Sequence, residues 1–196
     1  CDNDSGDVND GCDWALNKAI DHQADYFGWD CDGLGISRKR QINQAIDGKK
    51  IESSMFKGSE RADNPDQIYT DLGNEQRSKS KTNKQTFKNK RAQYYWRLRD
   101  RFYATYRAVT KGEYIDPDQL ISLSSNIKDM DNLRAEVCRI PKKPNANGMI
   151  QIMSKEDMLK IDIPSPNMSD SIMMSMYIPD VAATGGDIEF DSLWNG

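Results

Sequence analysis

Three aspartates in this sequence occupy positions at which carboxylates commonly hold a metal ion. Asp30 and Asp32 lie in "YFGWDCDGLG", where an aromatic-rich segment runs into a glycine-rich loop, and Asp170 lies in "PNMSDSIMMSM", in the first turn of a predicted apolar helix. Mg²⁺ prefers a few carboxylate oxygens together with water and phosphate oxygens. Two such ions about 3.5–4 Å apart clamp the attacking and leaving oxygens of a phosphodiester. The three aspartates therefore indicate a two-metal phosphodiester site that takes Mg²⁺ or Mn²⁺.

Each of these aspartates also has a purely structural interpretation. Asp before Gly is typical of a turn that closes a strand, so Asp30 and Asp32 are also expected in an Asx turn. Asp170 in the first turn of a helix is favoured by the exposed N–H groups there, so it is equally a candidate cap. As a cap, it should tolerate Asp170→Asn with stability unchanged to within about 0.5 kcal/mol. The sequence leaves both interpretations open.

Other catalytic chemistries find little support. The four cysteines have irregular spacings with no CxxC pair, which argues against a zinc site or a disulfide framework and predicts reduced thiols. A nucleophilic Cys31 or serine lacks a base, because His22 is the only imidazole and lies at a polar helix end. "DGLGIS" also lacks the GxxxxGK[ST] pattern of a phosphate-binding loop.

One segment is strongly basic although the chain carries a net charge of -4. Between Lys84 and Arg107 there are eight Lys and Arg residues against one acid, Asp100, and three consecutive aromatic residues lie among them. A solvated helix face would explain such charges, but clustered cations beside aromatic rings are also typical of a surface that binds DNA phosphates. The residues expected to bind nucleic acid are Lys84, Lys88, Lys90, Arg91 and Arg97.

The elements that position the aspartates begin with a helix over Gly11–Gln23, capped by Asp13. A buried strand over Ala24–Asp30, a helix over Ser37–Ile46 and a strand over Lys49–Phe56 follow. This order predicts a βαβ unit and a parallel or mixed sheet, hence an α/β fold.

The second half of the chain is predicted from similar signals. The expected elements are a mobile insertion over about 57–86, a long helix over Phe87–Val109, a helical turn after Pro117, a β-hairpin pairing Arg134–Ile140 with Gly148–Met153, a short helix capped by Ser154, and the helix that carries Asp170. Residues 1–178 should form one domain, and 179–196 a flexible tail.

Composition limits where the protein acts. The mean hydropathy is -0.82, no run of eighteen apolar residues occurs, and the N-terminus has no leader pattern. These features predict a soluble, unexported protein that does not enter a membrane. Because the chain begins with Cys1 rather than Met, we expect it to be a fragment.

Four segments together resemble a known family, the C-terminal nuclease domain of the large terminase subunit of tailed bacteriophages, which drives headful DNA packaging. They are "YFGWDCDGLG", "MFKGSE", "FKNKRAQYYWRLRDRF" and "MSKEDMLKIDIPSPNMSDSIMMSM". The resemblance extends from about residue 7 to 177. Its most specific parts are "NKRAQYYW" and the "SKEDM" and "SPNMSD" pieces of the last segment.

The resemblance implies an RNase H-like fold and a metal-dependent endonuclease that cuts concatemeric double-stranded viral DNA. It implies that Asp30 and Asp170 match two of three acidic metal ligands, that Asp32 lies near the metals, and that Lys155 steadies a phosphate or water. It also implies the portal protein and the small terminase subunit as partners, in the host cytoplasm during phage assembly.

One part of the family's pattern has no counterpart. The first-strand aspartate of the family lies upstream of the segment that this chain matches, so we expect an N-terminally incomplete domain that lacks one metal ligand. The packaging ATPase has no counterpart either, since no Walker A pattern occurs. Two alternatives therefore stay open: a catalytically incomplete DNA-binding or portal-docking module, and an RNase H-like transposase or resolvase.

Overall fold

A computed structural model of the chain describes residues 7–70 and 81–177. The first half comprises α1 (Val8–Asp21), β1 (Tyr26–Asp30), the 3₁₀ helix η1 (Gly33–Arg38), α2 (Lys39–Ile46) and β2 (Glu52–Phe56). β1 and β2 pair in parallel, with Asp30 opposite Phe56. The predicted βαβ unit is therefore confirmed. The cap of α1 is Asp7 rather than Asp13, because the Asp7 carboxylate accepts from the backbone N–H of Asn9 at 2.7 Å.

The second half of the described chain is mostly helical. Its elements are α3 (Asn83–Thr86), α4 (Lys90–Lys111), the 3₁₀ helix η2 (Pro117–Gln119), α5 (Met130–Cys138), α6 (Lys155–Leu159) and α7 (Asn167–Ser175). The long helix α4 begins at Asn89, whose side chain accepts from the N–H of Ala92 at 3.0 Å, and it ends at Gly112, with φ of 64°.

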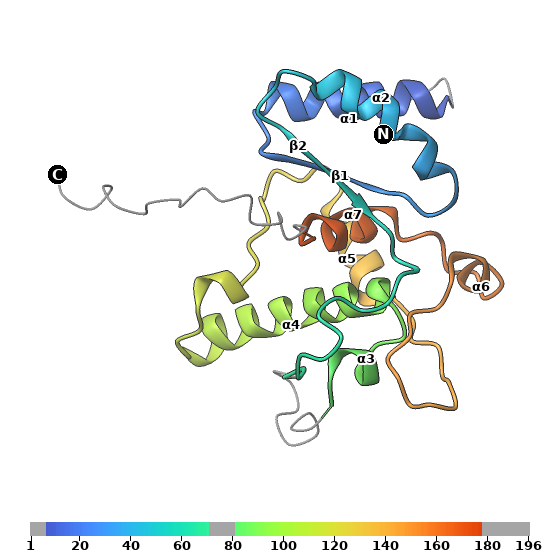
Figure 1. Cartoon of the computed structure of the whole chain (residues 1–196). Helices are drawn as coiled ribbons and strands as arrows, with labels where there is room; N and C mark the ends of the chain where they lie inside the picture. The colour runs from blue at the N-terminus through green and yellow to red at the C-terminus, as the bar shows by residue number, and fades with distance from the viewer. Residues whose placement is uncertain (1–6, 71–80, 178–196) are drawn as a thin grey trace.

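Helices lie on both faces of the small sheet, with α1 and α2 on one side and α4, α5 and α7 on the other (Figure 1). Leu16, Ile42 and Ile46 form the core beneath the first pair of helices. A larger core joins β2 to α4, α6 and α7; its buried members are Phe56, Ala92, Tyr94, Tyr95, Leu98, Ile152, Met158 and Met173. This three-layer arrangement brings the strand ends next to α4 and α7.

The two flanks of the predicted insertion over 57–86 pack into the fold. Ala62 and Asn83 are buried, and the Asn83 side chain donates to the backbone carbonyls of Asp63 and Asn64 at 3.0 Å each. The carbonyls of Gly58 and Glu60 accept from the first N–H groups of α4, at 2.9 and 2.7 Å. These bonds satisfy donors that a helix start leaves unpaired and anchor α4 to β2. Residues 71–80 of the insertion lie outside the described residues, as does the predicted tail 179–196.

The predicted C-terminal hairpin is wrong in its first strand. Residues 134–138 belong to helix α5, where Leu133 and Glu136 occupy buried positions three residues apart. The predicted second strand makes two isolated bridges, one between Ile152 and Lys142 and one between Ile150 and Phe87. In the part of the chain that the structure describes, the sheet has two parallel strands, which is the first of the two arrangements expected from sequence.

Among residues 7–70 and 81–177, no helix combines the length and the apolar character needed to cross a membrane.

Candidate functional site

Asp30 lies at the carboxyl end of β1, where the chain turns sharply into η1. Its Oδ1 accepts from the backbone N–H of Asp32 at 3.0 Å, so the Asx turn considered from sequence is present. The turn brings Gly35 against the strand: a methyl group on Gly35 would lie 1.8 Å from the carbonyl oxygen of Asp30. The indole of Trp29 then donates to the Gly35 carbonyl at 3.1 Å. Both aspartates are exposed, so the turn holds them at the strand end without burying them.

Asp32 is held by the segment that follows β2. Its carboxylate accepts from the backbone N–H of Ser59 at 3.0 Å and from the Ser59 hydroxyl at 2.7 Å. Gly58 makes this approach possible, because a methyl group there would lie 3.4 Å from Asp32 Oδ2 and 3.1 Å from the Cβ of Arg91. Gly58 thus lies between Asp32 and Arg91 at the start of α4, with no room for a side chain between them.

Asp170 is buried and faces three donors. The hydroxyl of Tyr95 donates to Oδ1 at 2.5 Å, and Arg91 Nη2 lies 3.4 Å from the same oxygen. Lys155 Nζ lies 2.9 Å from Oδ2, within ion-pair range but without hydrogen-bond geometry. Burial and the adjacent carboxylate raise the pKa of Tyr95 well above its ordinary value, so the phenol remains a donor. Oδ2 therefore keeps capacity to bind a further partner.

The capping interpretation of Asp170 is wrong. Neither Asp170 nor another side chain at the start of α7 makes a capping hydrogen bond there. The carboxylate of Glu136, on α5, instead accepts from the backbone N–H of Ser169 at 2.9 Å. Because a residue of another helix caps α7, the Asp170 side chain is left to face α4 and α6.

Arg91 links the two halves of the site. Besides Asp170, its guanidinium donates to the carbonyl of Met153 at 3.0 Å and packs over the ring of Tyr95 at 5.3 Å. Its Cβ adjoins Gly58, which Asp32 adjoins from the other side, and α7 packs on both β1 and α4. Asp170 therefore lies at the guanidinium of Arg91, and Asp32 lies across Gly58 from the Arg91 Cβ, with Asp30 two residues before Asp32 in the chain.

The ligand types at this site suit a divalent cation, although the side chains do not form a complete coordination shell. Carboxylate oxygens at a strand end and a buried oxygen with spare capacity, Asp170 Oδ2, are ligands that Mg²⁺ or Mn²⁺ takes together with water and phosphate oxygens. In the described ranges, no group of three or more His, Cys, Asp or Glu side chains gathers closely enough to hold a metal ion alone.

Lys155 is the first residue of α6, and its side chain is 43% exposed. The hydroxyl of Ser154 caps this helix by accepting from the N–H of Asp157 at 3.1 Å, as the sequence predicts. Lys155 therefore combines contact with Asp170 and access to solvent.

Asp157, on α6, pairs with Lys143 and Lys160. The effect of these pairs on the pKa of Asp157 can be tested. Hydrogen bonds from Lys143, at 2.6 Å, and Lys160, at 2.9 Å, lower the pKa of Asp157 from its ordinary 3.8 to about 2. A lowered folded-state pKa means that these pairs favour folding above the ordinary value and lose that effect as pH falls toward 2. We expect Lys143→Ala to raise the pKa of Asp157, measured by carboxyl ¹³C NMR, with Lys50→Ala as the exposed control. An Asp157 titration identical in both variants would contradict the assignment.

The predicted DNA-binding cations are scattered rather than gathered. Lys90 is buried and paired with Glu60 at 3.2 Å and Asp63 at 3.1 Å. Lys84 pairs with Asp66 at 2.5 Å, and Arg97 packs over the ring of a neighbouring tyrosine. Lys84 is exposed, Arg97 and Arg91 are partly buried, and Lys88, also exposed, is the most available of the five.

Cys31 does not act as a nucleophile in this geometry. It is 5% exposed, and burial together with the charges of Asp32 and Asp30 raises the pKa of its thiol. The described cysteines are free thiols, as expected. The site residues that sequence reasoning missed are Tyr95 and Glu136. Tyr95 entered the sequence analysis only as one of three consecutive aromatic residues in the basic segment, and no local signal points to Glu136.

No family profile matches this sequence, and none of the curated proteins matches it. Solved structures do match. The nuclease domain of the large terminase subunit of bacterial virus Sf6 is 44% identical over 88% of this chain and 74% of that one, with a TM-score of 0.80. A lysine-to-alanine variant of that domain, solved with manganese and beta-thujaplicinol, is 43% identical over 88% and 74%, with a TM-score of 0.81. The variant with calcium is 44% identical over the same shares, with a TM-score of 0.79.

Proposed function

Since this chain belongs to the nuclease domains of phage large terminase subunits, we propose that it is a divalent-metal-dependent endonuclease that cuts concatemeric double-stranded viral DNA during genome packaging. A nuclease role in packaging follows from the family. Metal dependence and the concatemeric substrate are the proposed part, as is an RNase H-like fold.

The buried carboxylate of Asp170 is the observation that carries this proposal. A charge removed from water is costly, and here it is retained beside Tyr95, Arg91 and Lys155 with one oxygen still able to bind. A purely structural acid would use both oxygens in hydrogen bonds. Strained or underused polar groups of this kind concentrate at functional sites.

In the proposed site, Asp170, Asp30 and Asp32 would supply carboxylate oxygens to the cation, and water and phosphate oxygens would supply its other ligands. When bound, the metal supplies Lewis-acid stabilisation of the phosphodiester and a more acidic bound water. Tyr95 and Arg91 fix the orientation of the Asp170 carboxylate. Lys155, with its exposed ammonium, contacts a phosphate oxygen of the bound DNA and offsets the charge of the carboxylates.

Metal binding tests the site directly. We expect the chain to bind Mn²⁺ and Asp30→Asn to weaken that binding at least tenfold, because an amide oxygen is a poorer ligand than a carboxylate. Titration followed by the electron paramagnetic resonance of free Mn²⁺ measures this without relying on cleavage. Asp47→Asn, an exposed acid at the end of α2, is the matched control. Equal affinity in wild type and Asp30→Asn would overturn the metal assignment.

DNA binding should depend on exposed rather than buried cations. We expect weak, sequence-independent binding of duplex DNA. In Lys88→Ala, the slope of the logarithm of the binding constant against the logarithm of salt concentration should be less steep by about one unit. Lys90→Ala should instead lower the melting temperature, because it leaves Glu60 and Asp63 without their buried partner. Fluorescence anisotropy over a salt series and thermal melts separate the two effects. A Lys88→Ala slope equal to that of wild type would count against this surface.

A second candidate function has one observation in its favour. The described residues gather fewer than three potential metal ligands, as a catalytically incomplete DNA-binding or docking module would. Plasmid cleavage that requires Mn²⁺ or Mg²⁺ and stops with EDTA would exclude it. The portal protein, the small terminase subunit and the host cytoplasm remain our proposals for partners and location.

A further inference from the structure

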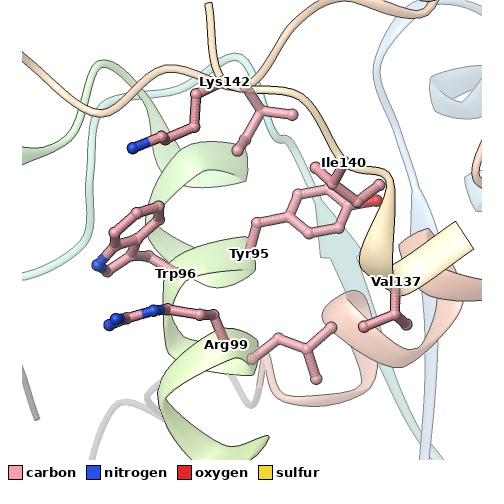
Figure 2. Close-up of a pocket in the computed structure, with 8 residues that line it drawn as sticks. Tyr95, Trp96, Arg99, Val137, Ile140 and Lys142 are labelled. Carbon is pink, nitrogen blue, oxygen red and sulfur yellow. The ribbon is translucent and has the colours of Figure 1, made fainter. Parts of the chain in front are cut away.

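A small apolar cavity lies between α4, the end of α5 and the segment that follows it. Its volume is about 130 Å³, and its lining combines Tyr95, Trp96, Leu98 and Arg99 of α4 with Val137 of α5, Ile140, Lys142 and Ile152. Figure 2 shows Tyr95 extending toward Ile140, with Val137 beside them. The volume suits one apolar side chain rather than a large ligand.

One edge of this cavity is cationic. The ammonium of Lys142 and the guanidinium of Arg99 lie 5.3 and 5.1 Å from the Trp96 ring. The nitrogen ends of all three side chains point to the same side in Figure 2, away from Val137 and Ile140. The indole N–H of Trp96 is buried and has no hydrogen-bond partner in the described part of the chain. An unpaired buried donor favours a ligand that brings an acceptor.

The cavity therefore fits an apolar side chain that is flanked by carboxylates. The apolar group would replace water against Val137 and Ile140, and the acids would face Lys142 and the indole N–H, beside Arg99, which already pairs with Asp100 at 2.8 Å. Duplex DNA matches this pattern poorly. Its phosphates suit the cations, but its bases are stacked and enter an apolar cavity only after unstacking.

The chain itself contains such a segment. Residues 187–194 read "DIEFDSLW", in which Asp187, Glu189 and Asp191 surround Phe190, and residues 178–196 contain no Lys or Arg. The described chain ends at Tyr177, whose ring lies 5.5 Å from that of Tyr94 on α4. Nine intervening residues span up to about 30 Å when extended, whereas a helix with its side chains is about 10–12 Å across. The segment is thus long enough to pass around α4 to the cavity.

We propose that residues 187–194 of this chain bind the cavity lined by Trp96, Arg99 and Lys142, with the Phe190 side chain inside and the flanking carboxylates at the cationic edge. The interaction is independent of the nuclease assignment. It gives α4 a second binding site, which shares Tyr95 with the Asp170 site because that ring lines the cavity and its hydroxyl donates to Asp170.

The indole N–H signal of Trp96 reports occupancy directly in ¹H–¹⁵N NMR of the full chain, once assigned with Trp96→Phe. Two variants should shift this signal and leave those of Trp14 and Trp29 in place. The first is Phe190→Ala, and the second combines Asp187→Asn, Glu189→Gln and Asp191→Asn. Val181→Ala and Asp180→Asn, in the same stretch outside the proposed segment, should leave all of them unchanged. Lys142→Glu, on an exposed residue, should also shift the Trp96 signal, and adding Glu189→Lys should restore it.

Each outcome decides the proposal. A Trp96 signal that does not respond to Phe190→Ala overturns it. A shift that grows with protein concentration assigns the cavity to the segment of a second copy and overturns intramolecular binding. A peptide of residues 186–196 added to the Phe190→Ala chain should restore the wild-type signal, and its own Phe190→Ala form should bind roughly tenfold more weakly. If only a duplex oligonucleotide restores the signal, the cavity is a DNA site and the proposal fails.

Discussion

Asp170→Asn is expected to abolish DNA cleavage and to lower the free energy of unfolding by about 2 kcal/mol. A buried ion pair that loses one partner costs roughly 3–5 kcal/mol, and we reduce this because Lys155 is 43% exposed. Asparagine keeps an acceptor for Tyr95 but leaves the charges of Arg91 and Lys155 without their counter-ion. This differs from the near-neutral effect predicted from sequence, because Asp170, although in the first turn of α7, lies between two cations and caps no N–H group.

Two measurements separate the parts of this prediction. Urea unfolding gives the stability change, and plasmid nicking with Mg²⁺ or Mn²⁺, together with Mn²⁺ affinity, gives the functional change. Asp157→Asn is the matched control, since it also removes an aspartate paired with two cations, here Lys143 and Lys160, but lies on α6. If Asp170→Asn binds Mn²⁺ and nicks DNA as wild type does, the metal role of Asp170 is refuted, whatever its stability.

Gly35→Ala is expected to destabilise the fold by about 3 kcal/mol and to weaken Mn²⁺ binding as well. The added methyl group would lie 1.8 Å from the carbonyl oxygen of Asp30, so backbone and not a flexible side chain must move. That movement would break the bond from Trp29 to the Gly35 carbonyl and displace the strand end. One small substitution thus changes both the packing of η1 and the geometry of Asp30.

Gly28→Ala provides the control on the same strand. A methyl group on Gly28 would make only an ordinary contact, at 3.8 Å from the Ser54 carbonyl oxygen, so stability should stay within about 0.5 kcal/mol. Thermal melts of both variants check the pair. A Gly35→Ala chain as stable as Gly28→Ala would mean that the turn into η1 is far more adaptable than its contacts indicate.

Local signals were sufficient for most of the elements. The end of β1 at Asp30, the Ser154 cap and the start of the last helix each depend on residues a few positions apart. Sequence therefore located Asp30 and Asp170 correctly on a strand end and a helix start. Helix α5 was missed because its buried positions are Leu133 and the polar Glu136, and an apolar pattern cannot reveal a buried acid.

The partners of each charge depended on distant residues. Lys90 and Arg91 belong to a basic run, which predicts a DNA surface, yet their partners Glu60, Asp63 and Asp170 lie tens of residues away. Only the packing of α4 against the segment after β2, and of α7 against α4, reveals that these cations are internal. Clustering along the chain measures local charge, whereas exposure depends on the tertiary fold.

The bond from Glu136 to the first turn of α7 has a consequence for cooperativity. Because one end of α7 is completed by a carboxylate of α5, local unfolding of α5 removes the cap and should release α7 with it. The two helices should then behave as one foldon, with amide protons that share an opening free energy, while α1 on the far side of the sheet opens separately. The lifetime of Asp170 in its buried position is in this way set by a helix that contributes no ligand to the site.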